Sequence, residues 1–168
     1  MERLLGFYLG SHSDNRGRYL SEILVQDDLW FEVTHDYIQW LFPTREFSRV
    51  TPDAPVITSV LIEEFHQDEI LRNHLKASFY RMLQFYGLTE TAGQIGKARN
   101  WDERKVNWFV HDTHNNLRIT RMLKSMMALG LEAKALSFHD ALQKLCACEI
   151  DCGIGSTARD YWNRSIRP

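Results

Sequence analysis

The apolar side chains between Asp68 and Tyr86 recur at intervals of three and four residues, the spacing that places side chains on one face of an α-helix. Gly87 follows directly, in the position where a glycine with left-handed backbone geometry ends many helices. We therefore predict an amphipathic helix over residues 68–86 with one face in the core. Its apolar stripe consists of Ile70, Leu71, Leu75, Phe79, Met82, Leu83 and Tyr86.

A second stripe with helical spacing lies within residues 113–129, and Gly130 again follows the last helical position. Its apolar face consists of Ile119, Met122, Leu123 and Met126. A further helix is predicted over residues 137–145, because Ser137 and Asp140 have the spacing of a capping box at a helix start.

Glycine and proline mark the breaks between these elements. Asp14 and Gly17 indicate a turn, after which residues 18–26 show helical spacing. Pro43 must end or redirect the helix before it, since proline disfavours helical geometry at the preceding residue. Residues 89–100 contain two glycines and are predicted to form a loop.

The fold class follows from the balance of these signals. Helical spacing recurs along the chain, whereas no alternating run of β-branched residues is flanked by a hairpin dipeptide. A chain of 168 residues is long enough to bury a substantial core without disulfides or a structural metal. We therefore predict an all-α fold, a single compact multi-helix domain over residues 1–168.

Composition narrows the environment and the partners. With 44% hydrophobic and 25% charged residues the chain resembles soluble globular proteins, and a net charge of −2 gives no reason to expect nucleic-acid binding. Three cysteines near the C-terminus make a poor disulfide framework, which favours a reducing cytoplasm. The apolar stretch at residues 1–9 is too short to span a membrane, so we expect neither a signal peptide nor a transmembrane segment.

Two clusters far apart in the sequence mix hydrogen-bonding side chains with large apolar ones. They are HDYIQWLFP at residues 35–43 and HDTHNNLRITR at residues 111–121. Polar groups in such segments must be paired if they are buried, either with one another or with a ligand. The clusters therefore predict a binding site or a polar core.

The helix over residues 113–129 carries the clearest candidate for an anion site. His114, Arg118 and Arg121 share one face with Ser125, and Asn115 lies beside Arg118. Together with the free backbone N–H groups at the helix start, these side chains would converge on a phosphate or carboxylate. The candidate ligand-binding residues from both clusters are His35, Asp36, Gln39, Trp40, His114, Asn115, Arg118 and Arg121.

The same place has a structural interpretation, in which an acidic residue of this chain fills it. A lone charge on Asp36 is costly to bury and Arg118 cannot lose its charge, so each needs an opposite partner if it is shielded from water. We therefore predict that Asp36 lies within salt-bridge reach of Arg118 or Arg121, either directly or across a bound ligand.

The histidines and cysteines have further interpretations. His35 and Asp36 beside Trp40 could form an acid–base pair, but no nucleophile accompanies them, so Asp36 is more simply a cap or tether. His111 and His114 have a spacing that helices use for two metal ligands, but no complete metal signature is present. We expect no metal and no cofactor. The cysteines, which we expect to be structural, are Cys146, Cys148 and Cys152.

Four segments together resemble the conserved region of the opioid growth factor receptor family. They are the Asp14-x-x-Gly17-Arg18 pattern, HDYIQWLFP, SFYRMLQFYG at residues 78–87 and HNNLRITRMLKS at residues 114–125. The resemblance implies a helical domain and, for the namesake member, binding of the opioid growth factor, the enkephalin pentapeptide, with association at the nuclear envelope. It lends no catalytic residues. The namesake also has C-terminal repeats that this sequence lacks, so we expect a stand-alone domain.

We therefore expect a small peptide or an anionic small molecule as the ligand, bound between the two clusters. In this hypothesis Trp40 supplies apolar surface, the arginines hold a carboxylate and Asp36 takes a peptide amine. Two alternatives stay open. One is an enzyme acting on a small anionic substrate through His35, Asp36, His111 and His114, and the other is a scaffold whose polar clusters are internal. The expected location is the cytoplasm.

Overall fold

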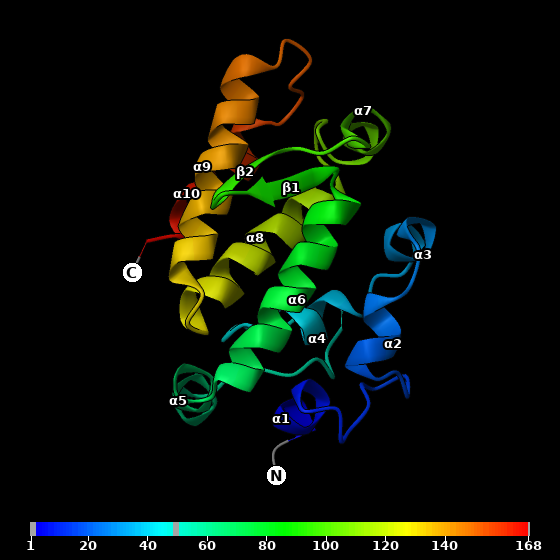
Figure 1. The fold of residues 1–168 in the computed structure, drawn as a ribbon, viewed down its shortest axis with the longest axis vertical. Coiled ribbons are helices and arrows are strands. Elements are labelled where there is room, and N and C mark those ends of the chain that lie inside the picture. The colour runs from blue at the N-terminus through cyan, green and yellow to red at the C-terminus, as the bar shows by residue number, and fades with distance from the viewer. Residues whose placement is uncertain (1–2, 49–50, 168) are drawn as a thin grey trace.

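The structure is a computed structural model that describes residues 3–48 and 51–167. Shorter helices and a third long one surround two long central helices, and the chain also forms a short β-hairpin (Figure 1). None of the helices in the described ranges is long and apolar enough to cross a membrane. The helices are α1 (Arg3–Tyr8), α2 (Leu20–Leu24), α3 (Asp28–Val33), α4 (Ile38–Leu41), α5 (Ser59–Gln67), α6 (Glu69–Phe85), α7 (Trp101–Arg104), α8 (His114–Ala128), α9 (Glu132–Cys148) and α10 (Ser156–Ser165), with a 3-10 turn at η1 (Lys105–Asn107). The strands are β1 (Leu88–Thr91) and β2 (Gln94–Lys97).

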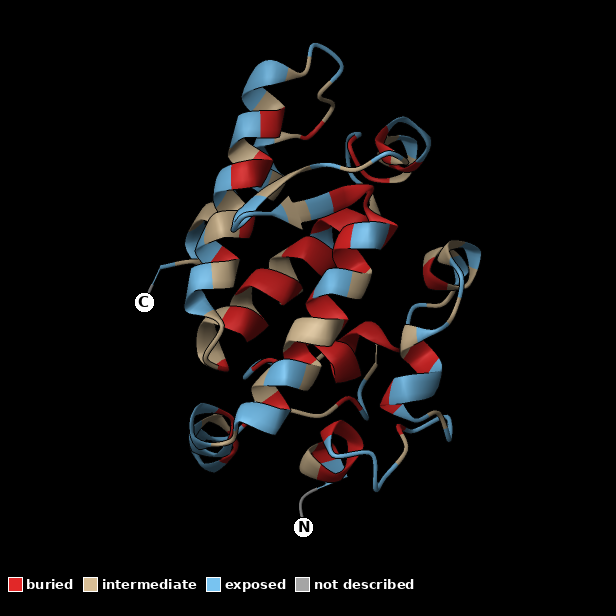
Figure 2. Ribbon diagram, viewed as in Figure 1, coloured by how far each residue is buried: buried red, intermediate tan, exposed pale blue. Residues whose placement is uncertain are grey.

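The core is centred on α6 and α8, whose inner faces are buried (Figure 2). The Asp68 side chain caps the start of α6, since it accepts a hydrogen bond from the Ile70 backbone N–H at 2.7 Å. Gly87 follows the end of α6 with φ +73°. The helix predicted over residues 68–86 is confirmed, although Ile70 in its first turn is exposed rather than part of the buried stripe.

The second predicted long helix is also confirmed. α8 begins at His114, and Gly130 follows its end with φ +83°. α9 and α10 pack against α8, while the segment from Phe31 to Phe42 covers another side of it through hydrogen bonds from Arg118 and Arg121. Polar residues of α8 are therefore buried together with its apolar stripe.

The prediction that residues 89–100 form a loop is wrong. β1 and β2 form an antiparallel hairpin in which Thr91 pairs with Gln94 beside the turn. In the turn, Ala92 has φ +51° and Gly93 has φ +79°. A two-residue turn of this kind needs positive φ at both positions, and alanine rarely adopts it, so this dipeptide gives no hairpin signal. The fold is mainly helical, as predicted, but it is not purely α.

Two helix boundaries also differ from the prediction. α9 begins at Glu132, so Ser137 and Asp140 lie inside the helix and form no capping box. The Ser137 hydroxyl instead donates to the carbonyl of Gly93, which joins α9 to the hairpin turn at 3.3 Å. The helix predicted over residues 18–26 is shorter, because α2 has only five residues.

Candidate ligand-binding site

The two polar clusters meet in the folded chain, on the side of α8 that faces α4. A hollow of about 240 Å³ lies there. Its lining residues are His35, Ile38, Gln39, Ser48, His114, Leu117, Arg118 and Arg121. Most of the candidate residues predicted from the sequence therefore border one space, and Asp36, Trp40 and Asn115 do not.

Arg118 forms the inner wall of the hollow and is only 4% exposed. Its terminal nitrogens donate to the backbone carbonyls of Phe31 and Thr34 at 2.9 and 2.7 Å, and to Asn115 Oδ1 at 3.0 Å. These carbonyls belong to the C-terminal end of α3, where helix carbonyls lack partners of their own. Arg118 thus caps the C-terminal end of α3 from a helix distant in the sequence. Its guanidinium is therefore engaged by groups of the protein itself.

The histidine at the rim of the hollow is held in one tautomer by the same arginine. Arg118 Nη2 lies 3.1 Å from His35 Nδ1, and a guanidinium can only donate a hydrogen bond. His35 Nδ1 must therefore accept, and in the neutral ring this places the proton on Nε2. The ring meets His114 edge to face at 4.9 Å between centroids.

Glu32 links α3 to the second cluster and was not predicted from the sequence. Asn115 Nδ2 donates to Glu32 Oε2 at 3.2 Å, and His114 Nε2 lies 3.2 Å from Glu32 Oε1. Burial and the charge of Arg118 lower the pKa of His114, and Glu32 opposes this shift only partly. No sequence signal pointed to Glu32, because a single acidic residue in a short helix is ordinary.

Asp36 does not reach the arginines of α8 in this structure. Its carboxylate pairs with Arg16 at 2.8 Å and with Arg18 at 2.9 Å, and Arg18 also pairs with Asp14. Burial opposes ionisation, but the hydrogen bonds and charges of Arg18 and Arg16 hold the pKa of Asp36 below its usual value. The predicted direct contact with Arg118 or Arg121 is therefore wrong. The partners of Asp36 are instead Arg16 and Arg18, which belong to the turn that the sequence predicted at Asp14 and Gly17.

Trp40 belongs to the core and contributes no surface to the hollow. It is 3% exposed and packs against Phe7 with ring centroids 5.1 Å apart. α4 is a single turn that ends before Pro43, as predicted, and it directs Gln39 toward α8 while Trp40 points away from it. Trp40 therefore anchors the segment that carries the site.

Arg121 and Gln39 are the groups in the hollow whose hydrogen bonds are incomplete. Arg121 Nη1 donates to the carbonyl of Phe42 at 3.2 Å, and no acidic side chain of the described residues forms a salt bridge with it. Gln39 is only 5% exposed, and its Oε1 has no hydrogen-bond partner among the residues that the structure describes. Beside them, Ile38 and Leu117 supply apolar walls. The hollow can thus take a ligand that has an anionic group, a hydrogen-bond donor and an apolar part.

The remaining candidate chemistry does not assemble at the hollow. His111 lies outside it and pairs with Asp112 at 3.0 Å on the exposed surface. Among residues 3–48 and 51–167, no group of three or more His, Cys, Asp and Glu side chains is placed to hold a metal ion. The four-residue acid–base set of the enzyme alternative is therefore split between separate places.

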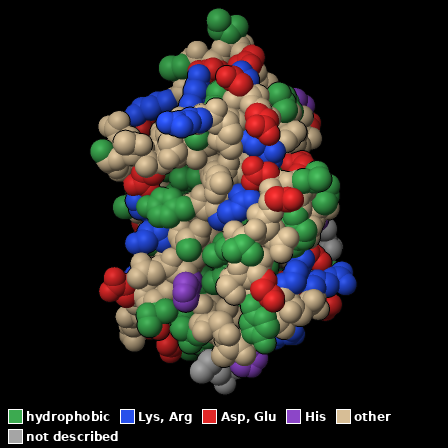
Figure 3. All heavy atoms as spheres, turned by 45° about the vertical axis from the view of Figure 1, so that its right-hand side comes forward, with side chains coloured by type: hydrophobic (Ala, Val, Ile, Leu, Met, Phe, Trp, Pro, Cys, Tyr) green, Lys and Arg blue, Asp and Glu red, His purple; other side chains and the backbone are tan. Residues whose placement is uncertain are grey.

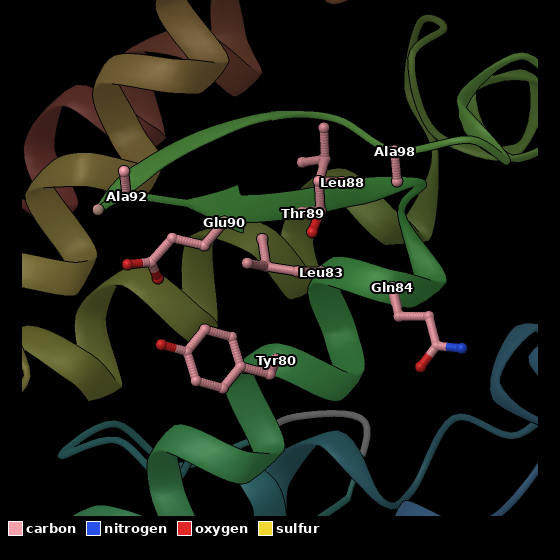
Figure 4. A pocket seen from close by; sticks show the side chains of 9 residues that line it. Tyr80, Leu83, Gln84, Leu88, Thr89, Glu90, Ala92 and Ala98 are labelled. Carbon is pink, nitrogen blue, oxygen red and sulfur yellow. The ribbon is translucent and has the colours of Figure 1, made fainter.

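Other features of the surface lie apart from the two clusters. A hollow of about 420 Å³ between α6 and the hairpin is bordered by Tyr80 and Glu90, whose polar ends extend to the same side of it (Figure 4). Lys134 already pairs with Glu90 at 2.5 Å. On the face drawn in Figure 3, the described acidic and basic side chains are interspersed rather than gathered by sign.

The chain matches the family described as the opioid growth factor receptor (OGFr) conserved region over residues 5–167. It belongs to this family. It is 42% identical to the human opioid growth factor receptor over 144 residues, which are 81% of this chain and 20% of that protein. It is 41% identical to the mouse opioid growth factor receptor-like protein 1 over 126 residues, which are 70% of this chain and 26% of that protein. The chain thus spans about a fifth to a quarter of the length of these relatives. No solved structure matches the chain significantly.

Proposed function

We propose that this OGFr-family chain binds the carboxylate end of a small peptide in the hollow between the two clusters. The observation that carries the proposal is the state of Arg121. Its guanidinium borders the hollow, and its hydrogen bond to the Phe42 carbonyl uses one nitrogen, Nη1. The other donors of a planar guanidinium match a carboxylate in a bidentate arrangement.

Gln39 extends the match from the carboxylate to the rest of a terminal residue. A buried amide oxygen without a partner costs on the order of 1–3 kcal/mol, which a ligand donor would recover. In a peptide, the backbone N–H of the last residue lies next to the terminal carboxylate. We therefore infer that this N–H donates to Gln39 Oε1 while the carboxylate contacts Arg121.

The size of the hollow limits how much of a peptide it can hold. A volume of about 240 Å³ lies below the range of about 300–1,000 Å³ typical of small-molecule sites. The hollow therefore suits one terminal residue, whose apolar side chain would contact Ile38 and Leu117. Earlier residues of the peptide would lie outside it.

The names of the relatives support a peptide ligand. Proteins similar to this chain are named opioid growth factor receptor in human and mouse, and the conserved region is the part they share with it. We extend ligand binding, and not the activity of the longer relatives, to this chain.

Other residues of the clusters have a supporting role in this proposal. Arg118 hydrogen-bonds to the end of α3 and to Asn115, so at the inner wall of the hollow these polar side chains have the structural role considered for the clusters. Asp36 cannot take the peptide amine as first expected, because Arg16 and Arg18 already engage its carboxylate. No observation favours a reaction over binding.

Isothermal titration with a pair of short peptides tests the proposal. The first is an acetylated tripeptide ending in leucine with a free carboxylate, and the second is its C-terminal amide. We expect the free acid to bind at least about tenfold more tightly, since one charge-assisted pair is worth about 1.5–3 kcal/mol. Equal affinity of the acid and the amide, or no binding of either, would contradict the carboxylate site.

Matched variants locate the binding. Arg121→Gln should remove the preference for the acid, whereas Arg99→Gln, which removes the same charge from an exposed position outside the hollow, should leave it unchanged. A preference that survives Arg121→Gln would place the carboxylate elsewhere.

We also propose that the protein functions in the cytoplasm. Its three cysteines are free in the structure, which is the state that a reducing compartment maintains. Fractionation of cells that express the full-length protein would test this, and recovery in the secreted fraction would contradict it.

A further inference from the structure

A second and larger hollow lies at the other end of α8, with a volume of about 710 Å³. It shares no lining residue with the site proposed above. Five parts of the chain form it, namely the segment after Pro43, α5, and the ends of α8, α9 and α10. Its lining residues are Thr44, Arg45, Glu46, Ile57, Ile62, Lys124, Met127, Ala128, Glu132, Arg164, Ser165 and Arg167.

The floor of this hollow is apolar. Ile57 is 3% exposed, and Ile62 and Met127 are partly buried against the core. Their side chains come from different parts of the chain, and Ala128, which is also partly buried against the core, lines the hollow with them. An apolar floor open to solvent favours a ligand that covers it with hydrocarbon.

Basic side chains dominate the polar part of the lining. Lys124 pairs with Glu46 at 2.7 Å, so these two charges cancel. Arg45, Arg164 and Arg167 form no salt bridge with an acidic side chain of the described residues, and Glu132 is the remaining acid. Three arginines against one glutamate leave the hollow with a net positive charge.

We propose that this hollow binds a single-chain anionic amphiphile, with its apolar tail on the Ile62 and Met127 floor and its head group on Arg164 and Arg167. The volume lies inside the range of about 300–1,000 Å³ that holds small molecules. A carboxylate and a phosphate head share this chemistry, because both accept paired hydrogen bonds from arginine. The ligand thus differs in class from the peptide proposed for the first site, and the inference stands without it.

The test titrates the full-length protein with dodecanoate and with dodecyl phosphate, each below its micelle concentration. Binding is measured by calorimetry and by the methyl NMR signal of Met127. Two further probes separate the contributions: dodecyl maltoside has the same tail with a neutral head, and inorganic phosphate has no tail. We expect both anionic amphiphiles to bind and to shift the Met127 signal. Dodecyl maltoside should bind at least about tenfold more weakly, and inorganic phosphate should not saturate. The tighter of the two anionic probes identifies the head group.

Variants of matched charge locate the site. Arg164→Gln combined with Arg167→Gln should weaken dodecanoate binding by at least about tenfold, while Arg99→Gln combined with Arg159→Gln should not change it. Met127→Glu should also abolish binding, because it places an acid on the floor. If Met127→Glu unfolds, the double variant Arg164→Gln/Arg167→Gln alone tests the location of the site. Equal binding of dodecyl maltoside and dodecanoate would overturn the proposal, as would unchanged affinity in the arginine pair. Loss of dodecanoate binding in Arg121→Gln alone would assign it to the first hollow instead.

Discussion

At the scale of single residues, Arg118 and Arg121 occur one turn apart on α8 and differ in what they contact. Arg118 donates to two backbone carbonyls of another element, whereas Arg121 donates to one and faces the hollow. Both were candidate ligand residues in the sequence, because both share the helical face of His114. Which arginine is used internally depends on where α3 ends in space, and helical spacing carries no such information.

The contacts of Arg118 predict a large effect on stability. Arg118→Gln should lower the free energy of unfolding by about 2–4 kcal/mol, because it leaves buried carbonyls of α3 without donors. Arg118→Lys should not restore the loss, since an ammonium lacks the planar fork that reaches both carbonyls. Denaturant titration measures this, with Arg121→Gln as the control that we expect to change stability by less than about 1 kcal/mol. Similar losses in both variants would show that the roles are not divided.

The ion pairs of Asp36 predict which residues are energetically coupled. In a double-mutant cycle, Asp36→Ala and Arg18→Ala should couple by about 0.2–1 kcal/mol, the range for partly exposed pairs. The cycle of Asp36→Ala with Arg118→Ala should be additive, because no salt bridge joins these residues. Both cycles can be measured by urea denaturation. Coupling in the second cycle and none in the first would show that Asp36 interacts with Arg118, as first predicted, and not with Arg18.

The pKa of His114 predicts a dependence of stability on pH. Burial and Arg118 lower this pKa from its ordinary value of about 6.5, so the folded chain resists a proton that the unfolded chain binds. Stability from this group is therefore complete above pH of about 6.5 and declines as the pH falls below it toward the folded-state pKa. The melting temperature measured at several pH values should decline less steeply in His114→Asn than in the natural protein. Parallel curves would show that His114 does not titrate as described.

At the scale of elements, the long helices could be predicted and the hairpin could not. α6 and α8 have strong apolar spacing and a glycine at the end, and these signals act locally. The hairpin turn contains Ala92 at φ +51°, a conformation that only the surrounding strands and α9 make favourable. The start of α9 was missed for a related reason, because Ser137 bonds to the hairpin rather than to its own helix.

Gly87 and Gly93 have similar backbone angles but different surroundings, so alanine substitutions there distinguish the cost of backbone strain from the cost of steric crowding. Gly87 has φ +73°, and a Cβ there would lie 2.8 Å from the Cα of Trp101, whereas a Cβ on Gly93 at φ +79° would meet nothing within 4 Å. Gly93→Ala should cost about 1 kcal/mol from backbone strain alone. Gly87→Ala should cost about 1–3 kcal/mol more, because α7 must move away. Thermal denaturation of the two variants measures the difference, and equal losses would mean that the packing of α7 behind α6 is looser than described.

At the scale of the whole molecule, the site exists because segments far apart in the sequence pack on one helix. The sequence identified His35, Gln39, His114, Arg118 and Arg121, which all border the hollow. It could not show that Asp36 turns toward Arg16 and Arg18, nor that Glu32 of α3 contacts His114 and Asn115, since both depend on how α3 and the segment after it are placed. Membership of the OGFr conserved region agrees with the sequence resemblance over nearly the entire chain.

The central claim is that Arg121 and Gln39 together receive the terminal residue of a peptide. The most direct measurement is an NMR titration that follows the Arg121 Nε–H signal and the Gln39 side-chain amide signals as the acetylated tripeptide ending in leucine is added. We predict that both sets of signals shift with one saturation curve for the free acid, and that the C-terminal amide shifts them far less. Signals of Arg121 and Gln39 that stay unchanged while the peptide binds elsewhere would contradict the account.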